Sequence, residues 1–261
     1  MPVNRLSLYE AAREAARLGG QRSRQLLHAA AVRSKSESYD LVTDADLETE
    51  RYIREVLLSR FPKHEILGEE GGGSTPLDAP ALWIVDPIDG TNNFVHGIPH
   101  YGCSVAYAEG GEVVAGAVFD PERGELFSAY LGGGAYLNGE RIGASAASRL
   151  SEAMVCTGFY YDRGTMMRRT LEAIERLFEA KIHGIRRTGS AALDICWTAC
   201  GRFDAYFEFN INPWDFAAGV LILEEAGGIA TGSDGAPLSL ESRQIVCSGR
   251  DLHRELISIL P

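Results

Sequence analysis

Two aspartates, Asp86 and Asp89, follow directly on an apolar run in the stretch LWIVDPIDGTNNF. Carboxylates this close repel one another and raise each other's pKa unless a cation or a proton lies between them. The run ALWIV predicts a buried strand that ends at Pro87, so Asp86 is expected at a strand end, where layered α/β proteins often build their sites. The pair is typical of a metal site, although Asp beside Pro and Gly is also common in turns and caps.

The residues after the pair, Gly90 and Thr91, are expected to open a short helix. Backbone amides at the start of a helix are unpaired and lie at the positive end of its dipole, so they can hold a phosphate. One short peptide thus offers both oxygen ligands for a cation and amides for an anion. His96 lies in the same stretch, and packing or hydrogen bonding within the loop is expected for it.

Other acidic residues occur at expected ends of strands and helices. Glu69 and Glu70 precede a glycine-rich loop in LGEEGGG, and Asp215 begins a helix in NPWDFAAG. A solvated loop and an N-cap are the simpler explanations for each segment alone. Together, without a His or Cys ligand set, the acidic segments suit Mg²⁺, which prefers oxygen ligands and retains waters. Asp44 and Asp46, in YDLVTDADLETE, are expected at a capped, solvated helix start.

Composition and charge limit the class of protein. The chain has 261 residues, of which 45% are apolar and 23% charged, as in globular proteins that form one large domain or two lobes sharing a cleft. The formal net charge of −11 argues against a generally basic surface for nucleic acid. The same charge repels a phosphorylated substrate unless bound metal reverses the potential at the site.

The cysteines and the apolar runs indicate a soluble protein of a reducing compartment. The five cysteines are odd in number and form no CxxC pair, as expected of reduced thiols in the cytoplasm. Cys196 and Cys200 lack partners arranged for zinc, so core packing is expected for both. No run approaches the roughly 18 apolar residues of a membrane helix, and the N-terminal segment lacks the apolar stretch of a signal peptide.

Hydrophobic periodicity predicts two differently organised halves, with a compositional shift near residues 140–150. The first half reads as two helices and a meandering, antiparallel sheet, and the second as alternating α/β layers. Helices are expected over residues 7–30, 45–60, 165–180, 191–200 and 216–228, and strands in EILGEE, ALWIVD, CSVAYAE, EVVAGAVFD, GELFSAY and FDAYFEF.

Three motifs, GEE, DPIDGTNNFVHGIP and NPWDFAAG, occur in order, with KSESYDLVTDAD upstream and RRTGSAALD before the last. They closely resemble the inositol monophosphatase family, bacterial branch, of the lithium-sensitive, Mg²⁺-dependent sugar-phosphatase superfamily. The match runs from about residue 35 to 228, and the pair DPIDGTxNF and WDxAAG is highly specific. The resemblance implies an α+β / α/β fold, an alternating five-layer αβαβα sandwich. It places an α+β lobe with most metal ligands in residues 1–140 and an α/β lobe in residues 141–261, commonly in a homodimer.

The resemblance also implies a ligand set for two or three Mg²⁺ ions per subunit. One ion is expected on Glu69, Asp86 and the Ile88 carbonyl. A second is expected on Asp86, Asp89 and Asp215, and a weaker third near Glu69. Asp86 bridges the first two ions, so the resemblance explains why the aspartates stand so close.

Catalytic roles follow from the same resemblance. Thr91 with Glu69 is expected to orient and deprotonate the water that attacks phosphorus in line, and Asp89 joins this catalytic set. The amides of Gly90 and Thr91 are expected to hold phosphate oxygens. No phosphoenzyme is expected, because a metal-activated water is a sufficient nucleophile at neutral pH.

Substrate recognition is assigned to two further residues. Glu208 and Ala191 match positions where inositol monophosphatases contact ring hydroxyls, and a carboxylate there rejects analogues that lack the donors. Phe159 stands where animal members carry a small polar residue, so one hydroxyl contact is expected to differ. The segments TGFYYD and RRTGSAALD are more similar to the bacterial branch, whose members also accept other sugar phosphates.

The predicted function is Mg²⁺-dependent, lithium-sensitive hydrolysis of myo-inositol 1-phosphate, a small phosphate ester, or of a related inositol or sugar monophosphate. Fructose 1,6-bisphosphate, histidinol phosphate and 3′-phosphoadenosine 5′-phosphate are the alternative substrates. Asn92 after DGT disfavours the last, because the nucleotide-specific branch usually has lysine there. A different class of function is a partner role in transcription antitermination, as in some bacterial relatives. Neither membrane binding nor direct binding of nucleic acid is expected.

Overall fold

A computed structural model describes residues 4–27, 32–34, 41–71, 75–159 and 163–261 of the chain. Seven helices lie in these ranges: α1 (Arg5–Leu26), α2 (Asp44–Arg60), α3 (Thr91–Val95), α4 (Thr165–Glu179), α5 (Ala191–Ala199), α6 (Pro213–Glu225) and α7 (His253–Ile259). None of them is long and apolar enough to cross a membrane.

The strands form a large sheet, a small sheet and a short hairpin. The seven-stranded sheet has the order β3 (Glu65–Gly68), β4 (Leu82–Asp89), β5 (Gly102–Glu109), β6 (Glu112–Asp120), β7 (Glu125–Tyr130), β8 (Gly134–Leu137) and β9 (Glu140–Arg141). The five-stranded sheet has the order β11 (Gly184–Arg186), β10 (Met154–Thr157), β12 (Ala205–Glu208), β14 (Ile245–Ser248) and β13 (Ile229–Thr231). The hairpin pairs β1 (Val32–Ser34) with β2 (Leu41–Thr43).

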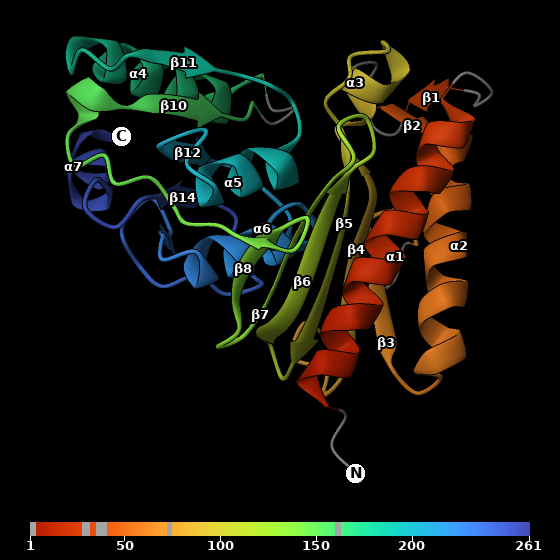
Figure 1. Cartoon of the computed structure of the whole chain (residues 1–261). Coiled ribbons are helices and arrows are strands. Elements are labelled where there is room, and N and C mark those ends of the chain that lie inside the picture. Colours follow the sequence, from red (N-terminus) through yellow and green to blue (C-terminus); the bar gives the residue numbers. More distant parts are fainter. Residues whose placement is uncertain (1–3, 28–31, 35–40, 72–74, 160–162) are drawn as a thin grey trace.

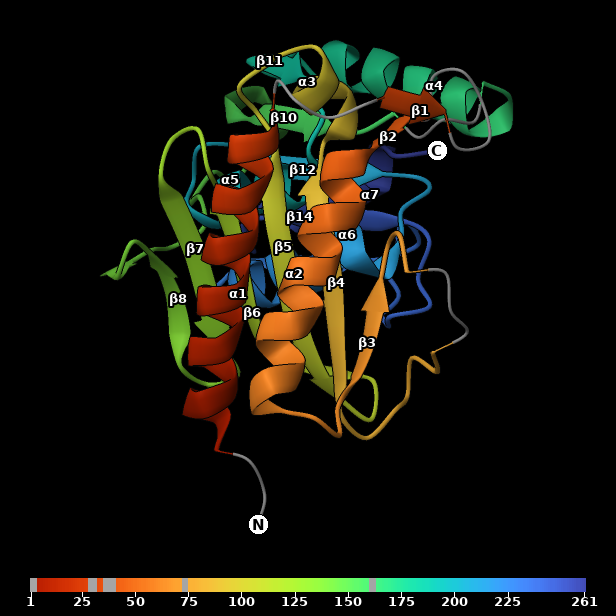
Figure 2. The same ribbon diagram turned by 90° about the vertical axis from the view of Figure 1, so that its right-hand side faces the viewer.

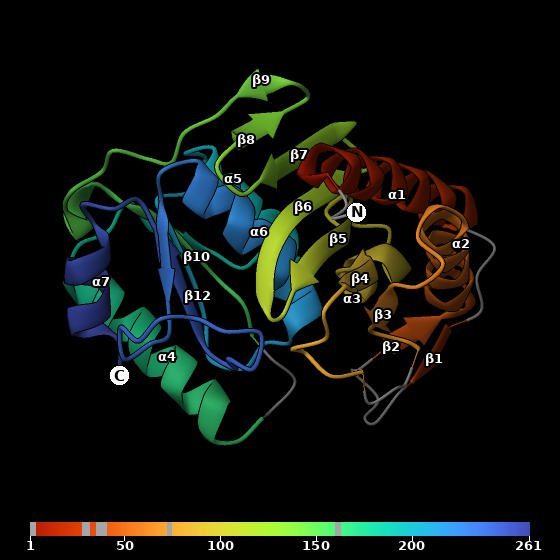
Figure 3. The same cartoon turned by 90° about the horizontal axis from the view of Figure 1, so that it is seen from below.

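The elements stack in five layers, so the predicted αβαβα sandwich is confirmed. Helices α1 and α2 cover one face of the large sheet, and α5 and α6 lie between the two sheets. Helices α4 and α7 cover the outer face of the small sheet (Figures 1 and 3). Figure 2 shows α1 and α2 side by side across the strands of the large sheet. Each sheet thus buries both faces, which explains strands such as β4 that are buried along their whole length.

One hydrophobic cluster runs through the middle layer and joins the two halves of the chain. It contains Leu82 and Phe127 from the large sheet together with Leu193 and Ala218 from α5 and α6. Burying apolar surface from both sheets against the same two helices stabilises their relative position. The lobe boundary near residue 140 stays a prediction.

Two details of the predicted elements are corrected. The sheet is antiparallel from β4 to β9, but β3 pairs parallel with β4, and the sequence between Gly68 and Leu82 is long enough for the connection that parallel neighbours need. Helix α6 begins at Pro213, whose fixed φ suits the first turn of a helix, rather than at residue 216. Helix α1 ends at Leu26, and the predicted extension to residue 30 falls in residues 28–31, outside the described ranges.

Helix α1 passes through Gly19 and Gly20 without a break. A Cβ on Gly19 would lie 2.6 Å from Cδ1 of Ile53 in α2, and one on Gly20 would lie 2.6 Å from Cδ1 of Phe119 in β6. The two glycines therefore let α1 approach both its neighbour helix and the sheet. This close packing stabilises a helix that the glycines alone would weaken.

Candidate active site

The end of β4 departs from regular strand geometry between the two aspartates. Asp86 pairs with Ser104 and Asp89 with Gly102, with a register shift between the two pairs. The strand therefore continues through Pro87 instead of ending there, because a bulge tolerates a residue without an N–H. In a regular strand, residues three apart point to opposite faces. The bulge allows both carboxylates to reach one site.

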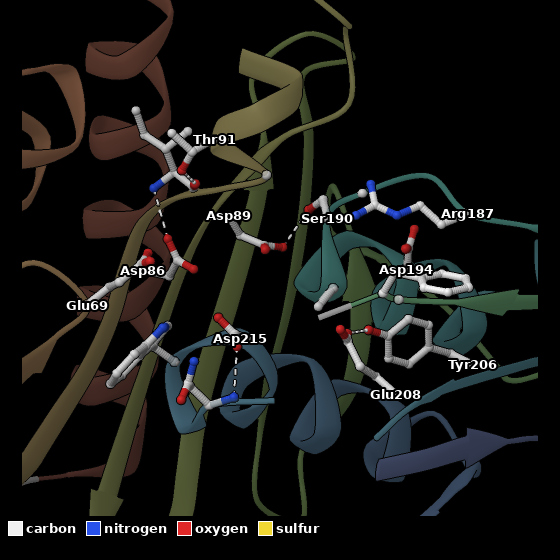
Figure 4. Close-up of a pocket in the computed structure, with 18 residues that line it drawn as sticks. Glu69, Asp86, Asp89, Thr91, Arg187, Ser190, Asp194, Tyr206, Glu208 and Asp215 are labelled. Carbon is white, nitrogen blue, oxygen red and sulfur yellow. Dashed lines mark hydrogen bonds between the residues drawn. The ribbon is translucent and has the colours of Figure 1, made fainter. Parts of the chain in front are cut away.

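Asp215 reaches the same site from the start of α6. It is the third residue of the helix, and its Oδ2 accepts a hydrogen bond from the Asn212 amide at 2.8 Å. Asn212, rather than Asp215, is the N-cap residue. One carboxylate oxygen is thus used to cap the helix, and Figure 4 shows the side chain facing Asp86 and Asp89. Asp215 can therefore cap α6 and belong to the acidic cluster at the same time.

The three aspartates form a cluster that could hold a metal ion. Oxygen atoms of Asp86, Asp89 and Asp215 lie within 4.8 Å of one another. Burial, followed by the charges of Glu69 and Asp89, raises the pKa of Asp86 well above its usual value. Burial and the charges of Asp89 and Glu69 do the same for Asp215. A cation removes this repulsion and carboxylate oxygens suit it, so the residues fit a divalent metal.

Asp89 also connects the cluster to α5 by hydrogen bonds. Its Oδ2 accepts a hydrogen bond from Ser190 Oγ at 2.5 Å and one from the Ala192 amide at 2.7 Å. Burial raises the pKa of Asp89 to about 7, although these two hydrogen bonds lower it. Ser190 was missed by the sequence analysis. As a serine directly before the apolar segment AALDIC, it carries the signature of the N-cap that it is.

The hydroxyl of Thr91 lies between the cluster and α2. Thr91 Oγ1 is 3.1 Å from Asp46 Oδ1 and 3.1 Å from the Ile88 carbonyl, within donor distance of both. Asp46 caps α2 as predicted, because Oδ2 accepts hydrogen bonds from the amide and hydroxyl of Thr43 at 2.8 and 2.6 Å. The predicted solvation of Asp46 is wrong, since its side chain is fully buried. Burial raises its pKa to about 6, and Asp44 beside it is only half-buried.

Gly90 begins α3 with a left-handed backbone, at a φ of 98°. A Cβ there would lie 3.0 Å from the carbonyl oxygen of Gly189. Glycine is therefore required both by conformation and by the approach of the loop before α5. Gly90 and Thr91 form part of the cavity wall, while His96, at the other end of α3, is exposed.

The loop that carries Glu69 is held by an acidic residue of α2. Glu50, 3% exposed, accepts a hydrogen bond from the Glu70 amide at 2.8 Å and one from Arg54 Nε at 2.9 Å. A Cβ on Gly68 would lie only 2.3 Å from the Glu50 carboxyl carbon, so glycine makes room for this contact. Glu50 is not among the residues predicted from the sequence, although its spacing of four from Arg54 is typical of an ion pair along a helix.

All the predicted site residues come together in the wall of one cavity of about 340 Å³ (Figure 4). Phe159 lines it as well, and residues 160–162 of the segment TGFYYD lie outside the described ranges. Lining residues that the sequence analysis did not identify include Arg187, Ser190, Asp194 and Tyr206. The predicted residues in the wall are Glu69, Asp86, Ile88, Asp89, Gly90, Thr91, Ala191, Glu208 and Asp215.

The cysteines are not among the residues that line this cavity. All five are free thiols, and Cys196 is buried while Cys200 is half-buried. Burial raises the pKa of Cys196 well above its usual value, which disfavours the thiolate that zinc requires. The prediction of core packing for this pair is confirmed.

Comparisons with known proteins agree with the geometry of the site. The sequence profile of the inositol monophosphatase family matches residues 4–261. An inositol-1-monophosphatase of Rhizobium meliloti is 42% identical over 222 residues, which cover 85% of this chain and 83% of the relative. A putative Nus factor SuhB of Neisseria meningitidis serogroup B is 41% identical over 252 residues and 95% of each chain.

A solved structure shares the whole fold. The extragenic suppressor protein suhB of Bartonella henselae superimposes with a TM-score of 0.91 at 33% identity, covering 97% of this chain and 98% of the other. The family profile spans both β4 and α6. These two elements supply the three clustered aspartates. The chain therefore belongs to the inositol monophosphatase family, a family of metal-dependent phosphatases.

Proposed function

We propose that this protein is a Mg²⁺-dependent phosphomonoesterase that hydrolyses myo-inositol 1-phosphate, or a closely related sugar phosphate, to the polyol and phosphate. The observation that carries the proposal is the convergence of Asp86, Asp89 and Asp215 in one cavity. The relatives named inositol-1-monophosphatase support this choice of substrate. A cavity of about 340 Å³ is of the size of small-molecule sites.

In this proposal, two or three Mg²⁺ ions are held by Glu69, Asp86, Asp89, Asp215 and the Ile88 carbonyl. When bound, the metal supplies Lewis-acid activation of water and stabilises charge on the phosphate and on the departing oxygen. Carboxylate and carbonyl oxygens would favour Mg²⁺ over softer metals. We also expect Li⁺ to inhibit turnover, as in the superfamily that the motifs resemble.

Thr91 and its neighbours position the reacting groups. The hydroxyl of Thr91, within donor distance of Asp46, orients the attacking water and passes its proton toward a carboxylate. Glu69 or Asp46 receives that proton, since both lie on the α2 side of the site. The amides of Gly90 and Thr91, at the start of α3, donate to phosphate oxygens.

The opposite wall of the cavity binds the leaving group. Glu208 accepts hydrogen bonds from ring hydroxyls, and Ala191 leaves space for the ring at the start of α5. A charge-assisted hydrogen bond of this kind discriminates against leaving groups that lack hydroxyls. Phe159 replaces one polar contact by an aromatic surface.

Phosphate release from a panel of substrates tests the proposal. The panel contains inositol 1-phosphate, fructose 1,6-bisphosphate, histidinol phosphate and 3′-phosphoadenosine 5′-phosphate, each with Mg²⁺, with EDTA and with added Li⁺. We expect the highest kcat/KM on inositol 1-phosphate, no turnover in EDTA, and inhibition by Li⁺. Preference for one of the other three esters would reassign the substrate, and turnover in EDTA would refute the metal dependence.

A role as a partner of the transcription machinery is the second candidate, because several relatives of nearly full coverage are named as Nus factors. Such a role needs the surface of the protein, whereas hydrolysis needs the aspartates. An Asp89→Asn protein tests the difference in an antitermination assay. Support of antitermination by this variant would establish a partner role that does not depend on catalysis, and loss of it with catalysis would argue against one.

A homodimer is also proposed, with α4 at the contact. Met167, Leu171, Ile174 and Phe178 follow one another at helical spacing on this helix, and Leu171 and Phe178 are 50% and 54% exposed. A Leu171→Glu/Phe178→Glu variant should sediment as a monomer while the parent sediments as a dimer. A parent that sediments as a monomer would contradict the proposal. The five free cysteines support a cytoplasmic location.

A further inference from the structure

The cavity wall opposite the aspartates contains a second polar pair, Tyr206 and Glu208. The two residues alternate along β12, so their side chains leave the strand on the same face, and both line the cavity. Tyr206 Oη donates to Glu208 Oε2 at 2.5 Å, as Figure 4 shows. Tyr206 is fully buried and Glu208 is 8% exposed, so the tyrosine lies behind the carboxylate and the carboxylate faces the cavity.

Gly158 makes room for the Glu208 carboxylate. A Cβ on Gly158 would lie 2.0 Å from Oε2 and 2.2 Å from the carboxyl carbon of Glu208. Non-bonded contacts of a Cβ are essentially never this short, so a side chain at this position would displace the carboxylate. The backbone of Gly158 is not in the left-handed region, and the requirement for glycine is therefore one of space.

The hydrogen bond from Tyr206 affects the protonation of Glu208 as well as its packing. Burial raises the pKa of Glu208 to about 7, the Tyr206 hydrogen bond and the positive charge of Arg187 lower it, and the charges of Asp89 and Asp194 raise it. Burial and the neighbouring carboxylate raise the pKa of Tyr206 well above its usual value, so its hydroxyl remains a donor. A donor held at one carboxylate oxygen favours the ionised form and fixes the orientation of the other oxygen.

We propose that Tyr206 is a positioning residue for substrate specificity: it holds the Glu208 carboxylate in the orientation that accepts hydrogen bonds from a polyol leaving group, in a space that Gly158 keeps open. The inference rests on the proposed function, because it takes the leaving group to carry hydroxyls. It assigns Tyr206 to the reading of the leaving group and not to the chemistry at phosphorus, which takes place at the aspartates.

The Tyr206→Phe variant tests this assignment, because it removes one oxygen and keeps the ring. On inositol 1-phosphate, kcat/KM should fall about tenfold, the loss expected for one hydrogen bond to a charged group, and the change should lie mainly in KM. On a small aryl phosphate without ring hydroxyls, both constants should stay unchanged. In the parent, KM should rise as the pH falls, because a protonated Glu208 loses its charge-assisted hydrogen bonds. In the variant this rise should begin at a higher pH, since loss of the donor raises the pKa of Glu208.

Two further variants separate positioning from packing. Combining Tyr206→Phe with Glu208→Gln should lose no more than Glu208→Gln alone, because the tyrosine acts through the carboxylate. The matched control is Tyr101→Phe, which removes a buried hydroxyl that donates to Glu122 Oε1 at 2.7 Å outside the residues that line the cavity. Its kinetic constants should equal those of the parent on both substrates.

The outcomes that overturn the inference are distinct from failure of the proposed function. Equal losses on both substrates, additive losses in the double variant, or no loss on inositol 1-phosphate would each refute a positioning role for Tyr206. If the parent hydrolyses neither ester, the proposed function fails. The link between the two side chains is then tested by the pKa of Glu208, measured by NMR of ¹³C-labelled glutamate carboxyls with Glu208→Gln for assignment. Tyr206→Phe must raise this pKa, and an unchanged value refutes the inference.

Discussion

The two walls of the cavity place carboxylates by different means. On the aspartate wall, formed by Asp86, Asp89 and Asp215, two of the three carboxylates come from one bulged strand end. On the β12 wall, formed by Gly158, Tyr206 and Glu208, the carboxylate occupies space left by a glycine fifty residues earlier in the chain. The first arrangement is local in sequence, whereas the second exists only in the folded protein.

The electrostatics of the two walls differ in the same way. On the aspartate wall, the neighbours of Asp86 are other acids, and their charges add to the effect of burial on its pKa. On the β12 wall, Tyr206 and Arg187 act against burial and lower the pKa of Glu208. The aspartate wall therefore leaves its negative charge for a cation or for protons to neutralise, while the β12 wall has its own stabilising groups. Changes to the first should affect metal and turnover, and changes to the second should affect substrate choice.

The largest effect is expected from Asp89→Asn. The variant removes a charged ligand, while the amide oxygen can still accept a hydrogen bond from Ser190, so the connection to α5 is retained. Turnover should fall by about 10³-fold or more, measured as kcat with saturating Mg²⁺. A variant with the circular dichroism spectrum and Tm of the parent and a near-parental kcat would show that Asp89 is only a turn residue.

A smaller loss of turnover is expected at the hydroxyl between the cluster and α2. Thr91→Ala removes the group that lies 3.1 Å from Asp46, and kcat should fall by about 10²-fold or more, the usual contribution of a proton-transfer group. Mg²⁺ affinity, measured by calorimetry, should remain close to that of the parent. Loss of metal binding in parallel with kcat would instead make Thr91 part of the metal site.

Glu208→Gln examines the β12 wall alone. Loss of a charge-assisted hydrogen bond is worth about 1–3 kcal/mol, or roughly 10- to 100-fold in kcat/KM for inositol 1-phosphate. The same variant should hydrolyse an aryl phosphate without ring hydroxyls at the rate of the parent. Similar losses on both esters would place Glu208 in the catalytic machinery and remove the distinction between the two walls.

The smallest expected effect is on stability. It tests whether the acids of the aspartate wall are protonated in the metal-free protein. In the metal-free protein, burial raises the pKa of Asp89 from 3.8 to about 7 and that of Asp46 to about 6, so the folded state binds protons more tightly than the unfolded chain. The resulting stability is fully present below about pH 4 and is lost as pH rises through about 7. In EDTA, the Tm should therefore fall by several degrees between about pH 5.5 and about pH 8.

Magnesium should reverse this trend, because it replaces the protons that the carboxylates lose. The increase in Tm on addition of Mg²⁺ should be larger at about pH 8 than at about pH 5.5. A Tm in EDTA that does not depend on pH would show that the aspartate wall is not strained without its cation.

What the sequence predicts well is what lies close together in the chain. Asp86 and Asp89 stand in one motif, periodicity predicts most of the helices and strands, and the five layers are what the family resemblance implies. Ser190 binds Asp89 across 101 positions of sequence, and Glu50 binds the amide of Glu70 across 20. Such contacts depend on packing between layers, which no local pattern encodes.

Two corrections have the same physical origin. Asp46 carries the pattern of a solvated helix start, but α3 packs over the start of α2 and the side chain is buried against Thr91. Pro87 carries the pattern of a strand end, but a bulge takes the strand past it to Asp89. In both cases tertiary contacts override a local sequence rule. Both residues lie at the candidate active site, where such exceptions are expected.

The most direct test of the central claim, that the aspartate wall is a cation site, is titration of Mg²⁺ into EDTA-treated protein by calorimetry. The parent should bind Mg²⁺ saturably, and so should Glu172→Gln, a matched control that removes one exposed carboxylate of α4. Asp215→Asn should lose the site that this residue shares with Asp86 and Asp89, so it should bind fewer Mg²⁺ ions than the parent while keeping its fold. Equal binding by Asp215→Asn and the parent, or full turnover of the parent in EDTA, would contradict the account.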